Sequence, residues 1–369
     1  MRVRARRVFT GHEVVDDGVL VVDGDRVVAV EGPDAAASVD LGDVTLAPGF
    51  VDVHAHGGGG AAFPDDPGAA LALHRSHGTT TSVASLVTQS LDVLEGQVRA
   101  LAPLVAAGEL AGIHLEGPWL APGRKGAHPL ERLRSPARPE VERLLDAGGG
   151  AVRMVTLAPE LPGGLDAVAL LAARGVVAAI GHTDADLATT RAAVAAGATG
   201  ATHLYNAMPG LHHREPGPVL GLVDDPRVWL ELVADGVHVH PELLAATMRC
   251  APGRVVLVTD AMAAAGCADG DYPLGDLAVE VRGGVARLAG QDTIAGSTLT
   301  LDAAVRLVVA AGIDWRDALR AATILPARYL YLDAVGELRP GAWADAVVLD
   351  AAWGVRGVLR HGSWVRPPG

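Results

Sequence analysis

Two histidines separated by one residue, His54 and His56, close an apolar stretch and are followed by four glycines. In a β-strand, side chains two residues apart point to the same face, so both imidazoles would share a face with Asp52. Imidazole nitrogen is a good ligand for Zn²⁺ or Fe²⁺. The pair alone is at least as compatible with two ordinary polar residues near a turn, so it needs support from elsewhere in the chain.

That support comes from further apolar stretches that also end in an ionisable residue. These residues are Glu116 in HLEG, His182 in IGHT, His203 in THLY and Asp260 in VVLVTDAM. Glutamate adds a carboxylate that can bridge two ions. Chance rarely places so many metal-type ligands at equivalent positions, and together they predict a metal centre.

Asp260 stands where a buried charge would be costly. Capping the next helix is one explanation. The other is catalysis, because a metal lowers the pKa of water from about 15.7 toward about 7, and a carboxylate can then take its proton at neutral pH. We therefore expect Asp260 to be the general base of a hydrolytic site.

The elements that must position these residues alternate between Val-rich and Ala/Leu-rich stretches. Helical stretches include 187–197 and 301–312, and the expected strands are 50–56, 79–87, 111–117, 152–159, 176–183, 199–205, 228–239 and 255–262. Eight strands alternating with helices predict a parallel (β/α)₈ barrel. Reactive residues of such barrels lie at the C-terminal ends of the strands, which is where the ionisable residues stand.

Both chain ends have a different sequence pattern, in which short β-branched runs are separated by turns. The sequence DGD at residues 23–25 is a hairpin signal. The organisation predicted is a β-sandwich domain formed by residues 1–47 and 337–369, around a catalytic barrel at 48–336.

Composition excludes several classes of protein. The 369 residues carry a formal net charge of −13, which argues against a nucleic-acid or anionic-membrane partner. No uncharged apolar run is long enough to predict a membrane span, and the basic start is not followed by the apolar segment of a signal peptide. Cys250 and Cys267 are expected to be reduced thiols in a cytoplasmic protein.

Several loops carry further polar residues: His128, Asn206, Arg214 and His238. Taken singly, each is as compatible with an ordinary loop as with a ligand contact. Arg214 is suited to clamp an anion, since guanidinium pairs bidentately with phosphate.

These motifs resemble one known family over nearly the whole chain. The matching segments are PGFVDVHAHG, GIHLEGPWL, KGAHP, GHTDA, THLYNAM, REPG, DGVHV, VTDAM, IAGSTLTL and GELRPGAWADAVVLD. The chain resembles the N-acetylglucosamine-6-phosphate deacetylases of the amidohydrolase superfamily. The resemblance implies hydrolysis of the acetamide of N-acetylglucosamine 6-phosphate to glucosamine 6-phosphate and acetate, and a homodimer.

The resemblance also implies roles for individual residues. Glu116, His182 and His203 would hold the principal ion, and His54 and His56 a second one bridged by Glu116, with Asp260 as the base. The metal would be Zn²⁺ or Fe²⁺. The substrate would contact Ala127, His128, Asn206, Ala207, Arg214, His238, Ile294, Ala295 and Gly296. In the family, the arginine at the position of Arg214 binds the phosphate across the dimer interface.

Three alternatives to this interpretation exist. Dihydroorotase-like and hydantoinase-like enzymes need a carbamylated lysine on strand four, and the only lysine here, Lys125, follows strand three. A D-aminoacylase-type or N-acetylgalactosamine-6-phosphate specificity stays open. A barrel without catalysis would predict a broken set of ligands, whereas every ligand position is intact.

Overall fold

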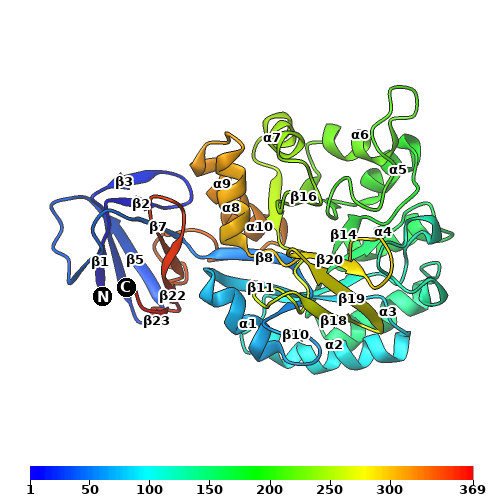
Figure 1. Ribbon diagram of the computed structural model, residues 1–369, viewed down its shortest axis with the longest axis horizontal. Coiled ribbons are helices and arrows are strands. Elements are labelled where there is room, and N and C mark those ends of the chain that lie inside the picture. The colour runs from blue at the N-terminus through cyan, green and yellow to red at the C-terminus, as the bar shows by residue number, and fades with distance from the viewer. Residues whose placement is uncertain (369) are drawn as a thin grey trace.

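Eight parallel strands follow one another in sequence order around one sheet of the computed structural model, which describes residues 1–368 (Figure 1). They are β8 (Phe50–Ala55), β11 (Thr79–Val87), β12 (Gly112–Glu116), β13 (Val152–Leu157), β14 (Val177–Ile180), β15 (Gly200–Ala201), β16 (Trp229–Val233) and β17 (Val255–Val258). The last strand returns to the first, where the N–H of Asp260 donates to the carbonyl of His54 at 2.8 Å. The predicted barrel fold is confirmed.

Helices separate the strands of the barrel. They are α1 (Pro67–Ser76), α2 (Leu91–Ala106), α3 (Arg138–Gly148), α4 (Gly164–Ala173), α5 (Leu187–Ala196), α6 (Gly217–Asp224), α7 (Pro241–Cys250), α8 (Leu301–Ala310), α9 (Trp315–Ala322) and α10 (Ile324–Tyr329). Helix α5 shows how local sequence sets these bounds. The side chain of Asp186 caps its first turn by accepting from the N–H of Thr189, and Gly197 ends it in a left-handed conformation.

The two chain ends form a separate β region (Figure 1). A four-stranded sheet has the order β5 (Arg26–Glu31), β4 (Val19–Asp23), β1 (Arg2–Arg4) and β6 (Val39–Asp40), and a six-stranded sheet has the order β23 (Ser363–Arg366), β22 (Val355–Arg360), β21 (Ala346–Leu349), β7 (Thr45–Pro48), β2 (Arg7–Phe9) and β3 (Val14–Asp16). The DGD hairpin joins β4 to β5. The domain limits at 47 and 336 stay predictions.

Further strands were not foreseen. A three-stranded antiparallel sheet of β18 (Gly270–Leu274), β19 (Leu277–Arg282) and β20 (Val285–Leu288) is inserted after the last barrel strand. A short pair, β9 (Gly57–Gly58) and β10 (Ala61–Ala62), follows the two histidines. Two 3₁₀ turns, Pro122–Arg124 and Leu130–Arg132, shape the loop after β12.

One expected element was too long. The stretch 228–239 was expected to be a strand ending near His238, but β16 stops at Val233. Asp235 accepts hydrogen bonds at 2.8 Å from the N–H groups of Val237 and His238, and this turn ends the extended conformation. His238 therefore lies in a loop beyond the strand.

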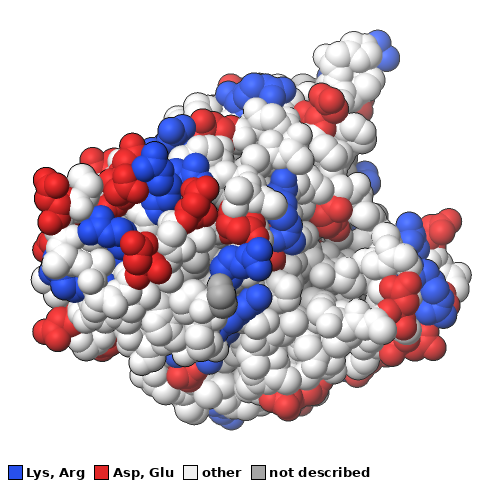
Figure 2. Space-filling view, turned by 60° about the vertical axis from the view of Figure 1, so that its left-hand side comes forward, with Lys and Arg blue, Asp and Glu red and all other residues white. Residues whose placement is uncertain are grey.

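The surface view shows how charged side chains are distributed on one face of the molecule (Figure 2). Figure 2 shows a face on which acidic and basic side chains are interleaved, with large areas that carry neither. Among the described helices, none combines the length and the hydropathy needed to cross a membrane. Cys250 and Cys267 are both free and exposed.

Candidate active site

The six ionisable residues predicted from the strand ends come together, buried, at the C-terminal mouth of the barrel. They form two groups, in each of which three ligand atoms lie within 4.8 Å of one another. We call His54, His56 and Asp260 the HAH group, and Glu116, His182 and His203 the glutamate group.

Glu116 connects the two groups. Its Oε1 lies 3.1 Å from Nε2 of His182 and 3.0 Å from Nε2 of His203, and these two nitrogens are 3.0 Å apart. Its Oε2 faces the HAH group and lies 3.2 Å from Nε2 of His56. The carboxylate thus offers one oxygen to each group, which is the arrangement of a ligand that bridges two cations.

The ligand atoms of the HAH group also lie close together. Nε2 of His56 lies 3.1 Å from Oδ1 of Asp260 and 3.3 Å from Nε2 of His54. Asp260 Oδ1 is also 3.5 Å from Nε2 of His54. Both histidines come from β8 or the residue directly after it, as their spacing predicted, while Asp260 comes from the far end of the barrel sequence.

The outer nitrogens of the histidines show which nitrogen faces the cavity. Nδ1 of His182 lies 2.8 Å from the carbonyl oxygen of Arg124, and Nδ1 of His56 lies 3.2 Å from that of Ser85. A carbonyl only accepts hydrogen bonds, so each Nδ1 carries a proton, and in the neutral ring Nε2 presents a lone pair. Lone pairs and carboxylate oxygens that converge in this way fit a divalent cation.

The electrostatics of the pocket also favour positive charge there. Burial opposes protonation of His56, but Asp260 and Glu116 outweigh it and raise its pKa to about 9. Burial likewise opposes ionisation of Glu116, yet the surrounding histidines, His54 foremost, hold its pKa well below the usual range. The pKa of Asp260 is also lowered against its burial, chiefly by the hydrogen bond from His56. The carboxylates are therefore charged and attract cations.

Three of the six residues have a backbone conformation that L-residues rarely adopt. The φ angle is +48° at His182, +29° at His203 and +50° at Asp260. Each stands two residues beyond the end of its strand; the strands are β14, β15 and β17, respectively. Such conformations cost of order 1–3 kcal/mol each and persist where the surroundings enforce them, which is common at functional sites.

A cavity of 390 Å³ opens over both groups. Besides five of the six ionisable residues, its lining includes seven of the nine predicted substrate residues: Ala127, His128, Asn206, Ala207, His238, Ile294 and Gly296. Ala295 is fully buried and does not line the cavity. Arg214 is not brought to the cavity of its own chain.

Arg214 lies instead on the exposed loop that precedes α6. This loop projects from the barrel (Figure 1). Its Nη1 lies 2.8 Å from Nε2 of His213, whose ring packs at 4.3 Å against that of His212. The structure therefore leaves the guanidinium at the surface of the single chain.

His128 is held in one tautomer. The N–H of Thr88 donates to its Nδ1 at 3.4 Å, and the Thr88 hydroxyl, 2.8 Å from the same nitrogen, can donate to it as well, so the proton of the neutral ring sits on Nε2. Burial lowers the pKa of His128 to about 3, which keeps the ring neutral. Nε2 lies 3.7 Å from Oε2 of Glu116, so this N–H is available beside the two groups.

With this geometry established, comparison with known proteins identifies the family. Residues 45–365 match the amidohydrolase family. The chain belongs to the amidohydrolase family. It is 38% identical to the N-acetylglucosamine-6-phosphate deacetylase of Bos taurus, over 94% of this chain and 90% of that one. It is 40% identical to the N-acetylgalactosamine-6-phosphate deacetylase of Escherichia coli O157:H7, over 98% of each chain.

A solved structure of this amidohydrolase family is also very similar. It is a mutant of the N-acetyl-D-glucosamine-6-phosphate deacetylase of Mycobacterium smegmatis, in complex with N-acetyl-D-glucosamine-6-phosphate. The sequence identity is 49% and the TM-score 0.97, over 100% of this chain and 99% of that one. The resemblance of the motifs to the deacetylases of amino-sugar phosphates is confirmed.

Strand four of the barrel carries no lysine. This strand, β13, places Thr156 beside Glu116 in the parallel register. The Oγ1 atom of Thr156 contacts Nε2 of His114 at 2.8 Å and Oγ1 of Thr202 at 2.7 Å. The carboxylate between the two groups comes from β12 instead.

Sequence reasoning missed several residues of the site. Thr88 orients His128, and Glu231 contacts His54. Arg124 lines the cavity but its guanidinium pairs with Asp184 at 2.6 Å. Leu274, from the unforeseen sheet, lines it too. The turn signals LGD and RGG in 274–284 could have revealed that sheet, whereas nothing local marks Thr88.

Proposed function

We propose that this chain hydrolyses the acetamide of N-acetyl-D-glucosamine 6-phosphate, with divalent metal ions held by the glutamate and HAH groups. The observation that carries the proposal is Glu116, which offers separate oxygens to two ligand groups at the floor of the substrate cavity. The names of the similar proteins support the substrate class. The products would be D-glucosamine 6-phosphate and acetate.

The principal ion would be held by Glu116, His182 and His203, and a second by His54 and His56 with Glu116 shared between them. When bound, Zn²⁺ or Fe²⁺ would supply Lewis-acid chemistry, lowering the pKa of a water molecule and polarising the acetamide carbonyl. Nitrogen and carboxylate ligands suit either metal.

Asp260 is the general base. Its ionised carboxylate lies against His56 and lines the cavity. It takes one proton from the hydrolytic water as the oxygen attacks the acetamide carbon, and returns that proton to the nitrogen as the C–N bond breaks. The oxygen of water ends in acetate, and the amine leaves with the sugar.

His128 and His238 flank the reacting amide. The Nε2–H of His128 is directed to the region of Glu116 and donates to the acetamide oxygen, on which negative charge develops. His238 is held by Asp235, whose Oδ2 lies 2.7 Å from Nδ1. Its Nε2 lies 3.8 Å from Oδ2 of Asp260, on the side where the leaving amine would stand.

The sugar phosphate would extend along Asn206, Ala207 and the segment Ile294 to Gly296. We assign the phosphate to Arg214 of a second copy of this chain. Support comes from its exposure on a projecting loop and from the pairing of Arg124 in the cavity with Asp184. The working form would then be a homodimer in which each chain completes the site of the other.

A substrate that carries a phosphate does not cross membranes unaided, because the charge is costly to desolvate. We therefore place the reaction in the cytoplasm, where sugar phosphates are retained.

The galacto epimer is a second candidate substrate. One similar protein, 40% identical, is named for N-acetylgalactosamine 6-phosphate. The epimers differ in the orientation of one hydroxyl, and a site that hydrogen-bonds one orientation discriminates strongly against the other.

An amine-release assay tests these proposals. N-acetylglucosamine 6-phosphate, its unphosphorylated form and the galacto epimer are compared on one metal-loaded sample. The gluco phosphate should be hydrolysed fastest. Equal rates with and without the phosphate would remove the role given to Arg214, and faster turnover of the galacto epimer would favour the second candidate.

A further inference from the structure

Glu231 is a fully buried carboxylate in the middle of β16, at 0% exposure. A carboxylate in such surroundings is costly unless hydrogen bonds compensate for the lost water. Its Oε1 accepts from the hydroxyl of Tyr329 at 3.2 Å, and its Oε2 accepts from the N–H of His203 at 3.4 Å. The remaining contact, between Oε2 and Nδ1 of His54, is the shortest at 3.0 Å.

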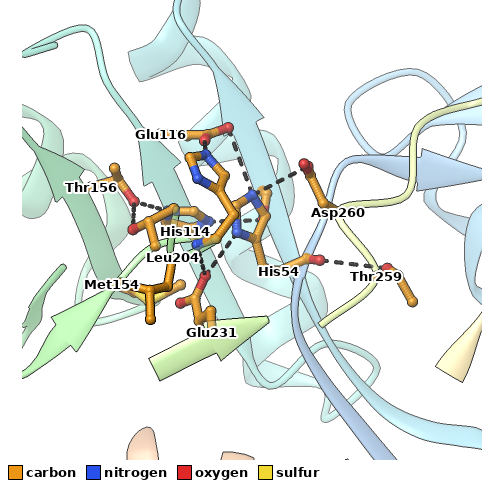
Figure 3. A network of polar contacts seen from close by, with 12 residues as sticks. His54, His114, Glu116, Met154, Thr156, Leu204, Glu231, Thr259 and Asp260 are labelled. Carbon is orange, nitrogen blue, oxygen red and sulfur yellow. Dashed lines mark hydrogen bonds and ion pairs between the residues drawn. The ribbon is translucent and has the colours of Figure 1, made fainter. Parts of the chain in front are cut away.

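This contact determines the tautomer of His54. Both oxygens of Glu231 are already engaged as acceptors, so Nδ1 of His54 is the donor and carries the ring proton. Nε2 then presents its lone pair toward His56, Glu116 and the cavity. Figure 3 shows Glu231 and Glu116 on opposite sides of the His54 ring. The ring of His114, edge-on at 4.6 Å, limits its rotation.

The support differs among the ligand histidines. His56 and His182 are held at Nδ1 by backbone carbonyls, at 3.2 and 2.8 Å. Nδ1 of His203 has no hydrogen-bond partner within the described residues. His54 alone among these four is held by a side-chain carboxylate. A carboxylate behind a ligating imidazole fixes its orientation and increases its basicity.

We propose that Glu231 is a positioning residue for the second metal ion: it orients His54 and strengthens the bond of His54 to the ion of the HAH group. This inference rests on the two-ion site proposed above. Glu231 does not line the substrate cavity, and the only ligand ring that its side chain contacts is that of His54. Its bond from the backbone N–H of His203 is long, at 3.4 Å, so we expect the effect to fall on the second ion.

Zinc titration of metal-stripped full-length protein, with calorimetry and elemental analysis, tests the proposal. Glu231→Met removes the acceptor and should weaken binding of the second zinc ion about 100-fold, while Glu231→Gln keeps an uncharged acceptor and should weaken it about 10-fold. Binding of the first zinc ion should be unchanged. Wild-type affinity for both ions in Glu231→Met, or equal weakening of both, overturns the proposal.

Tyr329→Phe is the matched control. It removes the hydroxyl at the other oxygen of Glu231 and leaves the His54 contact in place. It should lower the thermal stability of the metal-free protein, yet bind the second zinc ion as the wild type does. If it weakens the second ion as much as Glu231→Met, the role of Glu231 is general support of the core.

A measurement on the unchanged protein guards against variants that fail to fold. Long-range ¹H–¹⁵N spectra of ¹⁵N-histidine-labelled, zinc-loaded wild type should show His54, assigned from His54→Ala, with its proton on Nδ1. A proton on Nε2 contradicts the proposal. A wild type that binds one zinc ion only overturns the two-ion site itself, whereas two ions with the wrong tautomer overturn only the role of Glu231.

Discussion

The two halves of the metal centre are built by different means. In the glutamate group, His182 and His203 stand two residues beyond their strands with φ at +48° and +29°. In the HAH group, His54 lies within strand β8 and is held from behind by Glu231. The histidines of one half depend on enforced backbone conformations at loop starts, and His54 of the other depends on a carboxylate in the barrel wall; in the HAH group only Asp260 shares the positive φ.

The two halves can therefore lose their ions separately. A change in the loops after β14 and β15 threatens the ion that we consider essential. A change at β8 or β16 threatens the second ion while Glu116, His182 and His203 stay in place. Glu116 and the proton transfer by Asp260 are the two features that serve both halves.

The largest effect is expected from breaking the glutamate group. His182→Ala removes one of three ligands of the principal ion and should reduce amine release to background.

The double variant His54→Ala with His56→Ala should lose about one ion per chain while the other stays on the glutamate group. Elemental analysis and the rate of amine release, measured on the same samples, check both variants. A double variant with its full metal content would contradict the claim that the two halves hold separate ions.

Asp260→Asn should come next in size. The amide has nearly the shape of the carboxylate but cannot accept the proton of water, so kcat should fall by about 10³-fold or more. The glutamate group keeps all of its ligands, so its ion should remain bound. Near-normal turnover would rule out Asp260 as the base.

A smaller effect is expected from Arg214→Ala, which leaves both halves of the metal centre intact. Loss of charge-assisted hydrogen bonds to the phosphate should lower kcat/KM for the phosphorylated substrate about 10–100-fold. Metal content and turnover of the unphosphorylated sugar should not change. Mixing Arg214→Ala with Asp260→Asn chains provides a sharper check: mixed dimers have one intact site if Arg214 acts across the interface, and activity should reappear.

The smallest effect on activity is expected at Asp302, outside both groups. Burial opposes its ionisation, but hydrogen bonds from His77, Thr300 and Arg306 hold its pKa well below the usual range. A lowered pKa stabilises the fold above the unfolded value of about 3.9, and the gain disappears as pH falls. Asp302→Asn should cost about 1–3 kcal/mol of unfolding free energy at pH 7.

Unfolding in urea at several pH values measures this. The deficit of Asp302→Asn should shrink as the pH falls below about 4, because the wild-type carboxylate then becomes protonated as well. A deficit that is constant with pH would assign the loss to packing. Metal content should equal that of the wild type at neutral pH.

Sequence patterns predicted the barrel and the positions of its ligands because both follow simple rules. Parallel strands buried on both faces are continuous apolar runs, and strand ends of a barrel share one mouth. His54, Glu116 and Asp260 could therefore be grouped before their contacts were known. The contacts themselves, in which Glu116 divides its two oxygens, depend on side-chain geometry that spacing does not reveal.

Other features were beyond such rules. Glu231 is one polar residue in the strand WLELV, and its partner His54 is 177 residues away and meets it only when the barrel closes. Strand β16 ends before His238 because Asp235 forms a turn there. The apolar pattern of the sequence continues past this turn, so it predicted a strand that was too long. In the proposed dimer, Arg214 would meet the phosphate bound by a second chain, and the strand and helix pattern of one sequence carries no information on that contact.

The most direct test of metal-dependent deacetylation is zinc titration of the chelator-stripped enzyme with N-acetylglucosamine 6-phosphate present, counting bound zinc and released amine in the same samples. Amine release should be absent without metal and appear as the first ion per chain binds to the glutamate group. Release at the full rate from protein shown to be free of metal would contradict the account.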